Sequence, residues 1–435
     1  MLPRLARLRA AGSGAARPRR RGLTMASGLR AAGSRRRGLT LASGDDAAIL
    51  SQMKEYAERD RTHVSMETLI KTGWGELLEE SDSTRDMSQH ELTMLQVGTF
   101  LRHELPIRFA HRARELDNMP DGLYAMPSIQ KVKHWYCESF AQVMSHPETM
   151  RTSEEEESFR RSLDGVKDRH ADTNIAIAQG LIEYRDTVLT NKTFMVDLAE
   201  IHSIHAALNR FFLARIGMRV IIGHYIALQE TVSMPRDKVG LIDVNCVPRQ
   251  VAAHAADDAM YMCERAFGFS PEVEFHGSNL EHSLPYVSSH LYYIMFELVK
   301  NSLRATVEFQ MKNHGDAFDE EKLPPVSVII ADSEEMEDVV IKVSDQGGGI
   351  PRSHMPRILT YLFTTARSDL RLEDLDDLHD FGTANPLAGL GYGLPVAQTY
   401  IEYFGGRLTI MPVEGYGTDA FIYLPRIADI KEPLS

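Results

Sequence analysis

Four polar residues that could engage a charged ligand lie on one segment, residues 288–313. In a helix at about 100° per residue, Asn301 lies about 40° round from Glu297, Arg304 about 20° and Lys300 about 60°. Apolar residues recur at helical spacing through the segment, which predicts one long packed helix, and two serines at its start are expected to accept bonds from its first free amides. One face therefore carries a carboxylate, an amide and two cations. A solvated polar stripe is the alternative interpretation.

A second motif follows a predicted strand, residues 339–344. It begins with Asp345 and continues through three glycines, of which Gly347 and Gly349 are the first and the last. Consecutive glycines let the backbone come close to a flat ligand, and the aspartate can accept a hydrogen bond from an exocyclic amine. A tight turn would explain the same residues taken alone.

A third motif is the glycine loop of residues 389–394, which runs directly into a predicted helix, residues 395–404. Free amides at a helix start inside a glycine loop make a phosphate site. No strand precedes the loop in a β-α-β unit, so a Rossmann dinucleotide site is excluded. A fourth motif, Gly417-Thr418-Asp419, opens the last predicted strand. The four motifs in this order indicate a nucleotide site.

The elements that must position these motifs are expected in an α/β sandwich, a mixed sheet with helices on one face. The sequence predicts helices at residues 250–267, 288–313 and 395–404 and strands at residues 239–244, 273–276, 325–331, 339–344, 408–413 and 420–424. Residues 355–388 carry few secondary-structure signals after Thr365 and are acidic, which favours a mobile lid over the nucleotide.

The first half of the chain is glycine-poor and helical in pattern, and predicts an up-and-down four-helix bundle. Its candidate helices are residues 93–116, 128–144, 155–190 and 198–231, and the acidic run 154–157 is expected to start a solvated helix. Arg215 and Arg219 are four residues apart and share a helix face, where like charges cost energy unless an anion or a carboxylate receives them. Ordinary surface ion pairs are the alternative.

Charge divides the 435-residue chain into unlike parts. Residues 1–44 hold eleven arginines and no lysine, aspartate or glutamate, while the rest holds 37 basic against 61 acidic residues, a net charge of −24. The first part has the composition of an organelle transit peptide, with a basic nucleic-acid arm as the alternative. The acidic body speaks against nucleic acid as a partner. The three cysteines lie far apart in the sequence, which fits a reducing compartment. The chain has no uninterrupted run of 18 apolar residues, so the sequence predicts no membrane span.

The order of the four motifs is that of the ATP site of sensor histidine kinases, gyrases, mismatch-repair ATPases and heat-shock chaperones. Within that group the chain resembles the mitochondrial pyruvate dehydrogenase kinases, and among them the plant-type members. The resemblance covers nearly all of the chain after the first 90 residues and is carried by FELVKNSLRATVE, SDQGGGIPR, LTYLFTTA, LAGLGYGLPVA and EGYGTDAFIYL. It implies an α+β multidomain protein: a transit peptide (1–44), a helical regulatory and docking bundle (45–235) and an ATP-binding kinase domain (236–430).

The resemblance also assigns roles to the motif residues. Glu297 is expected to be the catalytic base and Asn301 a ligand of Mg²⁺, while Asp345 is expected to bind the adenine of ATP. Many animal members have a histidine four residues before the glutamate, where this chain has Tyr293. The other expected ATP contacts are Lys300, Arg304, Gly347, Gly349, Thr364, Thr365, Gly389, Leu390, Gly391, Tyr392, Gly393, Leu394 and Thr418.

The resemblance further implies a pocket in the bundle where pyruvate acts as an inhibitor. The matching residues are Tyr136, Ser139, His170, Arg215 and Arg219. The family usually has asparagine after the histidine, where this chain has Ala171.

The implied activity is that of an ATP-dependent serine kinase in the mitochondrial matrix, which phosphorylates and inactivates the decarboxylase component of the pyruvate dehydrogenase complex. A homodimer and binding to the lipoyl domain of the acyltransferase core are implied as well. A branched-chain 2-oxoacid dehydrogenase kinase is the alternative within the class. An ATP-driven clamp or chaperone ATPase is the alternative of another class.

Overall fold

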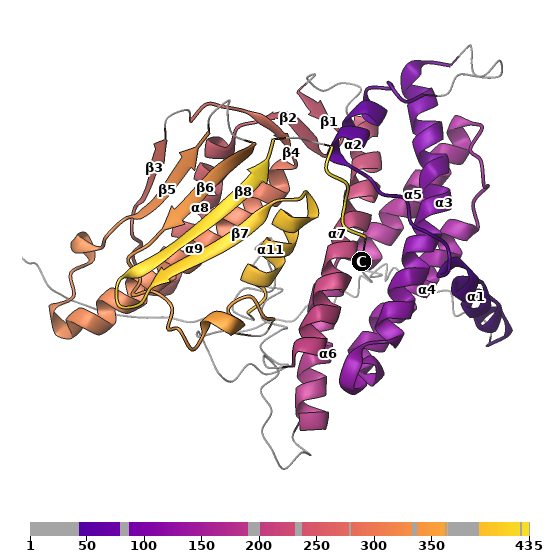
Figure 1. The fold of residues 1–435 in the computed structure, drawn as a ribbon. Coiled ribbons are helices and arrows are strands. Elements are labelled where there is room, and N and C mark those ends of the chain that lie inside the picture. Colours follow the sequence, from indigo (N-terminus) through magenta and orange to yellow (C-terminus); the bar gives the residue numbers. More distant parts are fainter. Residues whose placement is uncertain are drawn as a thin grey trace, which may run out of the picture.

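The structure is a computed structural model that describes residues 43–78, 87–189, 201–230, 237–277, 280–332, 337–361, 363, 391–426 and 429–434. A helical bundle lies beside a layered α/β unit (Figure 1). The predicted transit peptide up to residue 42 and most of the predicted lid lie outside the described residues.

The bundle has four long helical segments, as predicted, and two shorter helices precede them in the chain. Its elements are α1 (Ser43–Tyr56), α2 (Met66–Gly73), α3 (Gln89–Asp117), η2 (Pro120–Ala125), α4 (Pro127–Met144), α5 (Ser153–Arg169), α6 (Thr173–Tyr184), η3 (Arg185–Leu189) and α7 (His202–Glu230). Ser88 and Thr152 begin α3 and α5 with capping boxes, each closed by a glutamate three residues on. Helices α5 and α6 are separated by three residues and both pack against α4, so together they take the place of one helix of the four-helix bundle.

The prediction of one helix over residues 155–190 is wrong. The chain leaves the helix at His170, which ends α5 with φ −91° and ψ 6°, and a new helix begins at Thr173. At this break the imidazole Nε2 of His170 forms a hydrogen bond of 3.0 Å with Ser139 Oγ. A tertiary contact therefore overrides a continuous helical pattern.

The acidic run at the start of α5 is also less solvated than predicted. Glu156 is buried and accepts a hydrogen bond of 2.6 Å from the hydroxyl of Tyr225 on α7. Helix α7 is long and apolar enough by composition to cross a membrane, yet 72% of its apolar stretch is buried inside the protein. It is the core helix of the bundle.

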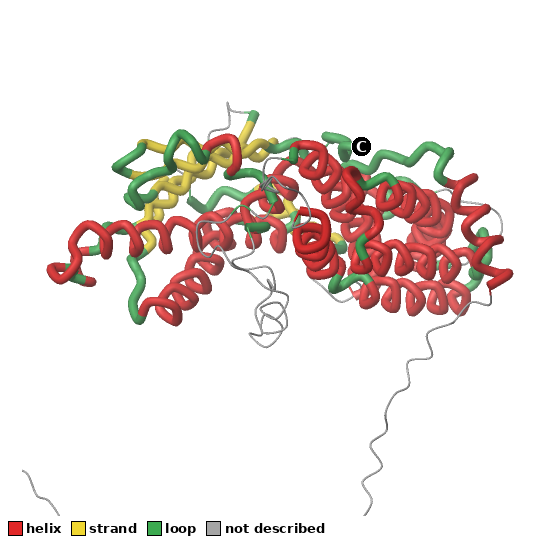
Figure 2. The backbone as a smooth tube through the Cα atoms, turned by 90° about the horizontal axis from the view of Figure 1, so that it is seen from below, coloured by secondary structure: helices red, strands yellow, loops and turns green. Residues whose placement is uncertain are grey.

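The α/β unit is a mixed five-stranded sheet in the order β3-β5-β6-β8-β7, in which β3 and β5 are parallel and the other pairs antiparallel. Helices α8, α9 and α11 form one layer against it (Figure 2). The elements are β3 (Val273–Gly277), β5 (Val326–Ala331), β6 (Asp338–Ser344), β7 (Arg407–Val413), β8 (Gly417–Pro425), α8 (Pro248–Phe267), α9 (Ser288–His314), η6 (Gly315–Ala317), η7 (Glu320–Lys322), η8 (Met355–Arg357) and α11 (Gly393–Tyr403). The predicted mixed sheet with helices on one face is confirmed.

A small second sheet joins the two halves, and its strands are β1 (Lys238–Val239), β2 (Ile242–Cys246) and β4 (Leu284–Tyr286). The run 239–244, predicted as one strand, turns back at Gly240, where φ is +57°. The left-handed conformation favoured by glycine thus makes a hairpin.

Helix α9 begins at Ser288, as predicted, but without the predicted side-chain cap. Val287 is the N-cap and no side chain caps the helix, because Ser288 and Ser289 already lie within its first turn. Its apolar stripe, which includes Leu291, Ile294 and Val299, is fully buried. Packing therefore holds the helix, and the predicted serine cap is wrong.

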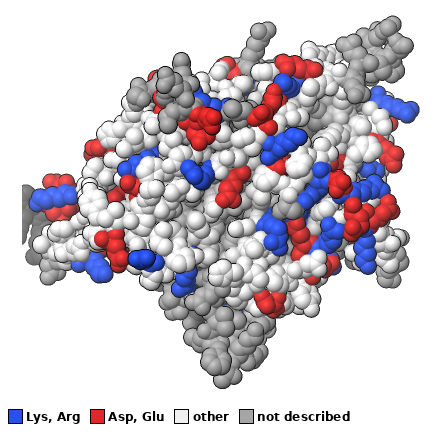
Figure 3. Space-filling model, in the orientation of Figure 1, with Lys and Arg blue, Asp and Glu red and all other residues white. Residues whose placement is uncertain are grey.

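Charge is mixed over the face of the molecule seen in Figure 3. Lysine and arginine side chains alternate with aspartate and glutamate side chains across it. Among the described residues on this face there is no continuous basic patch of the kind that binding to a nucleic-acid backbone requires.

Candidate active site

A cavity of about 520 Å³ collects residues from all four sequence motifs. Helix α9 forms one wall, the loop after β6 and the start of β8 form another, and the start of α11 closes the end. The predicted residues that line it are Glu297, Lys300, Asn301, Arg304, Asp345, Gly347, Gly349, Gly391, Gly393, Leu394 and Thr418. Residues more than 120 positions apart in the sequence thus meet around one space.

The carboxylate of Glu297 is the most buried acid in this cavity, with 2% of the residue exposed. Lys300, one turn further along α9, donates to both of its oxygens at 2.7 Å. The first residue of α11 is Gly393, and a Cβ there would overlap the Glu297 carboxylate, so any larger residue would force that side chain to move. The glycine motif therefore brings the start of α11 directly against the acid.

Asn301 and Arg304 share the wall with Glu297. Asn301 is exposed, whereas the guanidinium of Arg304 donates to Glu308 at 2.6 Å. Lys300 also lies over the ring of Phe296, at 4.9 Å from its centroid. Both cations near Glu297 therefore contact side chains of α9, the helix on which they lie.

Asp345 is buried at the far end of the cavity and is fixed by three donors. The amides of Gly347 and Thr418 donate to its Oδ1 at 2.9 and 3.1 Å, and the hydroxyl of Ser302 donates to Oδ2 at 3.0 Å. Burial raises the pKa of Asp345 above its ordinary value, and these hydrogen bonds oppose the rise. Ser302 was missed in the sequence, because it lies about 100° round α9 from Asn301 and so outside the polar face that the spacing defined.

Gly347 lets the motif loop approach α9. A Cβ there would lie 2.6 Å from the Cβ of Ala305 and 2.9 Å from the amide nitrogen of Thr306. The second motif therefore rests on the helix that carries the first.

The third motif is only partly described. Gly389 and Leu390 lie outside the described residues, and so do the predicted contacts Thr364 and Thr365 from the preceding segment. The side chain of Tyr392 turns away from the cavity and is fully buried, with ring centroids 6.1 Å from Phe212 of α7 and 5.4 Å from Tyr361. Of the predicted contacts in this loop, Gly391, Gly393 and Leu394 face the cavity.

A second and larger cavity, of about 990 Å³, lies between the bundle and helices α8 and α9. Tyr136, His170, Arg215 and Arg219 all line it, and so does Tyr293. Ser139 lies behind this wall, fully buried, where it hydrogen-bonds the imidazole of His170 and accepts a bond of 2.8 Å from Arg169. The structure thus brings together four of the five residues predicted for a pocket in the bundle.

Arg215 and Arg219 bring positive charge to the part of this cavity next to His170. Burial, with the nearby charge of Arg219, lowers the pKa of Arg215 only to about 10, so it stays charged. Burial, with the charges of Arg215 and Arg169, lowers the pKa of His170 to about 3, so the imidazole is neutral. Arg215 donates to the His170 carbonyl at 2.9 Å, but its Nε has no hydrogen-bond partner among the described residues. A buried cation with an unused donor suits a small anion.

Metal ligands are sparse in the described part of the chain. It contains no group of three or more histidine, cysteine, aspartate or glutamate side chains that could hold a metal ion. The exposed amide of Asn301, facing the cavity, is compatible with Mg²⁺, which keeps several waters and is often held by one or two protein oxygens and substrate phosphates.

Two family models match the chain in succession. Residues 75–243 match the model of the mitochondrial branched-chain alpha-ketoacid dehydrogenase kinases. Residues 286–428 match the model of the histidine kinase-, DNA gyrase B- and HSP90-like ATPases. The first match covers most of the bundle and the second contains every motif around the smaller cavity.

Individual relatives cover most of the chain. A mitochondrial [pyruvate dehydrogenase (acetyl-transferring)] kinase of Arabidopsis thaliana is 40% identical over 369 residues, which are 83% of this chain and 94% of that protein. The protein of the same name in Drosophila melanogaster is 36% identical, over 76% of this chain and 77% of its own length. That of Schizosaccharomyces pombe is 34% identical, over 79% and 91%.

Proposed function

Because the chain belongs to the family of mitochondrial pyruvate dehydrogenase kinases, we propose that it is an ATP-dependent serine kinase of the mitochondrial matrix. Its substrate is the decarboxylase component of the pyruvate dehydrogenase complex, which phosphorylation inactivates. The observation that carries the proposal is the convergence of all four motifs on the cavity beside the buried carboxylate of Glu297.

The proposed chemistry assigns proton transfer to Glu297, which accepts the proton of the serine hydroxyl as the serine oxygen bonds to the γ-phosphorus and ADP leaves. Phosphoryl transfer needs mainly alignment and charge neutralisation from the protein. Asp345 takes the adenine amine, and the amides at the start of α11 face the phosphates. Lys300 orients the Glu297 carboxylate, with its ammonium group at 2.7 Å from both oxygens. Arg304, Gly347, Gly349, Thr364, Thr365, Gly389, Leu390, Gly391, Tyr392, Gly393, Leu394 and Thr418 complete the proposed set.

The proposed metal is Mg²⁺, held by the side-chain oxygen of Asn301 together with the phosphates of ATP. When bound it would neutralise phosphate charge. The support is the exposed amide on the same wall as Glu297, one helical turn away.

The larger cavity is proposed as the regulatory pocket, where pyruvate binds. Its support is the charged, buried Arg215 with an unused Nε beside the neutral His170. A carboxylate would accept from this donor, and Tyr136, Ser139 and Arg219 complete the proposed pocket.

The proposed organisation is a transit peptide (1–44), a bundle that docks and regulates (45–235) and an ATP-binding domain (236–430). We also propose a homodimer, because β7 is the edge strand of the sheet and the apolar side chains of Met411, Val413 and Tyr416 are 52%, 60% and 60% exposed on and beside it. The lipoyl domain of the acyltransferase core is proposed as a further partner on the family resemblance alone. No nucleic-acid partner and no membrane span are proposed.

Parallel incubations with two substrates test the specificity. The purified protein and γ-labelled ATP are mixed with the pyruvate decarboxylase component in one arm and the branched-chain component in the other. Serine labelling of the first, with a matching loss of its activity, is the expected result. Preferential labelling of the second would overturn the proposal in favour of the branched-chain kinase.

A further inference from the structure

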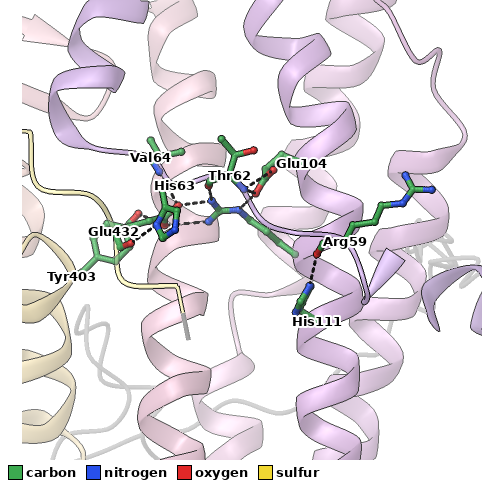
Figure 4. Close-up of polar contacts among 9 residues, drawn as sticks. Arg59, Thr62, His63, Val64, Glu104, His111, Tyr403 and Glu432 are labelled. Carbon is green, nitrogen blue, oxygen red and sulfur yellow. Dashed lines mark hydrogen bonds and ion pairs between the residues drawn. The ribbon is translucent and has the colours of Figure 1, made fainter. Parts of the chain in front are cut away.

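The C-terminal segment, residues 429–434, returns from the sheet to the bundle. Lys431 pairs with Ser65 in an antiparallel bridge, and the amide of Glu432 donates to the Val64 carbonyl at 3.0 Å. His63 Nδ1 lies 3.0 Å from the Glu432 carbonyl oxygen. The segment therefore forms a short two-stranded contact with residues 62–65, and the C-terminus lies beside the bundle (Figures 1 and 4).

The side chain of Glu432 points inward and is only 3% exposed. Both of its oxygens accept from the guanidinium of Arg108, with Nη1 at 3.1 Å from Oε2 and Nη2 on Oε1. The amide of Val64 adds a bond of 3.2 Å, and the hydroxyl of Tyr403 adds one of 2.9 Å (Figure 4). One carboxylate at the end of the chain thus collects four donors.

Arg108 is the centre of this network. It lies on α3, is buried, and also donates to Glu104 at 2.7 Å and to the Thr62 carbonyl at 2.7 Å. Burial opposes its charge, but the bond and charge of Glu432 and the charge of Glu104 outweigh burial and raise the pKa of Arg108 above its ordinary value. Such a buried ion network is weak evidence for stability and better suited to fixing one geometry.

The network joins elements that belong to different halves of the protein. Tyr403 ends α11, the helix whose first residues line the nucleotide cavity, whereas Arg108 lies on α3. Helix α7 contacts the network at Gly217, where a Cβ would lie 2.7 Å from Glu432 Oε2 and 3.2 Å from the Tyr403 ring. The missing side chain leaves room for Glu432 and Tyr403 against α7.

We propose that Glu432 is a positioning residue of the ATP site. By binding Arg108 and Tyr403 together, it holds the end of α11 against α3 and α7 and so fixes the direction of its glycine start. Helix α11 has 11 residues and is therefore about 16 Å long. If its end at Tyr403 shifts, the whole helix tilts and its start at Gly393 moves as well. The inference rests on the proposed function only through ATP use.

The test compares three variants of the full chain: Glu432→Gln, Tyr403→Phe and the control Glu402→Gln, whose exposed side chain is adjacent on α11. KM for ATP and kcat are measured well below each unfolding temperature. A misplacement of about 1 Å far from the chemistry can cost about 10²-fold. Glu432→Gln should therefore lower kcat/KM for ATP about 10- to 10²-fold, Tyr403→Phe should lower it less, and the control should match wild type.

A double variant and a binding measurement complete the test. Because both changes break one contact, the effects of Glu432→Gln and Tyr403→Phe should be less than additive. The affinity for a fluorescent ATP analogue should fall with kcat/KM, and this binding arm works without a protein substrate, even if wild type transfers no phosphate. Wild-type KM, kcat and affinity in both variants, with only a lower unfolding temperature, would overturn the proposal. If Glu432→Gln does not fold, Tyr403→Phe decides.

Discussion

The pairing of Glu297 with Lys300 determines what the proposed base must do before it can act. Lys300 donates to both carboxylate oxygens, so a serine hydroxyl must compete with an ammonium group for them. ATP phosphates offer that lysine a second anion. Nucleotide binding would thereby free one oxygen of Glu297 for the incoming hydroxyl.

Replacing Glu297 by glutamine tests this role. The change keeps the size and the helix propensity but removes the base, so ATP should still bind while phosphoryl transfer falls about 10²- to 10⁴-fold. Single-turnover transfer and nucleotide titration separate the two quantities. A variant that transfers phosphate at the wild-type rate would show that the base lies elsewhere.

Replacing Asn301 by alanine should abolish Mg²⁺-dependent activity and leave the fold intact. The side chain is exposed, and exposed polar truncations usually change stability by about 0.5 kcal/mol or less. Thermal unfolding of the nucleotide-free protein and the rate at saturating Mg²⁺ are the measurements. Asn313→Ala, exposed on the same helix, is the matched control, and a normal rate in Asn301→Ala would contradict the assignment.

The buried His224 predicts a pH dependence of stability. Burial lowers its pKa to about 4, whereas the pKa of a histidine in the unfolded chain is about 6.5. Above pH 6.5 both states are neutral, and as pH falls from there toward 4 only the unfolded state gains the proton, so the free energy of unfolding falls by up to about 1.4 kcal/mol per pH unit.

Urea unfolding of wild type and variant at pH 7.0, 6.0 and 5.0 measures the change in this slope. The buried His170 and His290, whose pKa values burial also lowers, contribute equally to both proteins. His224→Gln should reduce the slope by about one proton. An unchanged slope in the variant would mean that His224 does not titrate as described.

The loop after β6 can approach helix α9 closely because Gly347 has no side chain. Gly347→Ala would bring a Cβ within 2.6 Å of Ala305, and overpacking of this kind costs about 1–3 kcal/mol. The loop should move off α9 with Asp345, so ATP affinity should fall together with stability.

The control for this change is Gly165→Ala on α5. A Cβ there would meet only Gln142 Nε2 at 3.5 Å, an ordinary contact. Alanine favours a helix over glycine by up to about 1 kcal/mol, so stability should stay level or rise. Normal ATP affinity in Gly347→Ala would refute the role of the close approach.

Local patterns predicted most helices and strands of this fold to within a few residues. They missed the break at His170 and the turn at Gly240, since each depends on a contact or a backbone angle that periodicity does not encode. The order of the motifs predicted which residues meet around the nucleotide cavity. It did not predict that the Tyr392 side chain faces the bundle, because that depends on how α11 packs against α7. The pair of Lys300 with Glu297 was also missed, although the two residues are three apart on one helix, a spacing that lets side chains meet.

The same limit applies to the molecule as a whole. The contact of Arg108 with Glu432 joins residues 324 positions apart. No motif or spacing around either residue predicts that the two side chains meet. The acidic body and the arginine-rich first 44 residues, by contrast, follow from composition alone and indicate an imported protein.

The fate of the γ-phosphate tests the central proposal most directly. An ATP-driven clamp with the same site would pass phosphate to water, and loss of activity in a Glu297 variant cannot distinguish the two, because water and serine need the same base. The distinction must come from the products of the wild-type protein.

The measurement follows labelled ATP in the presence and absence of the decarboxylase component. We expect most of the turned-over phosphate to become acid-stable phosphoserine on that component, with little phosphate released when it is absent. Steady release of free phosphate in both reactions, with no label on serine, would contradict the kinase assignment.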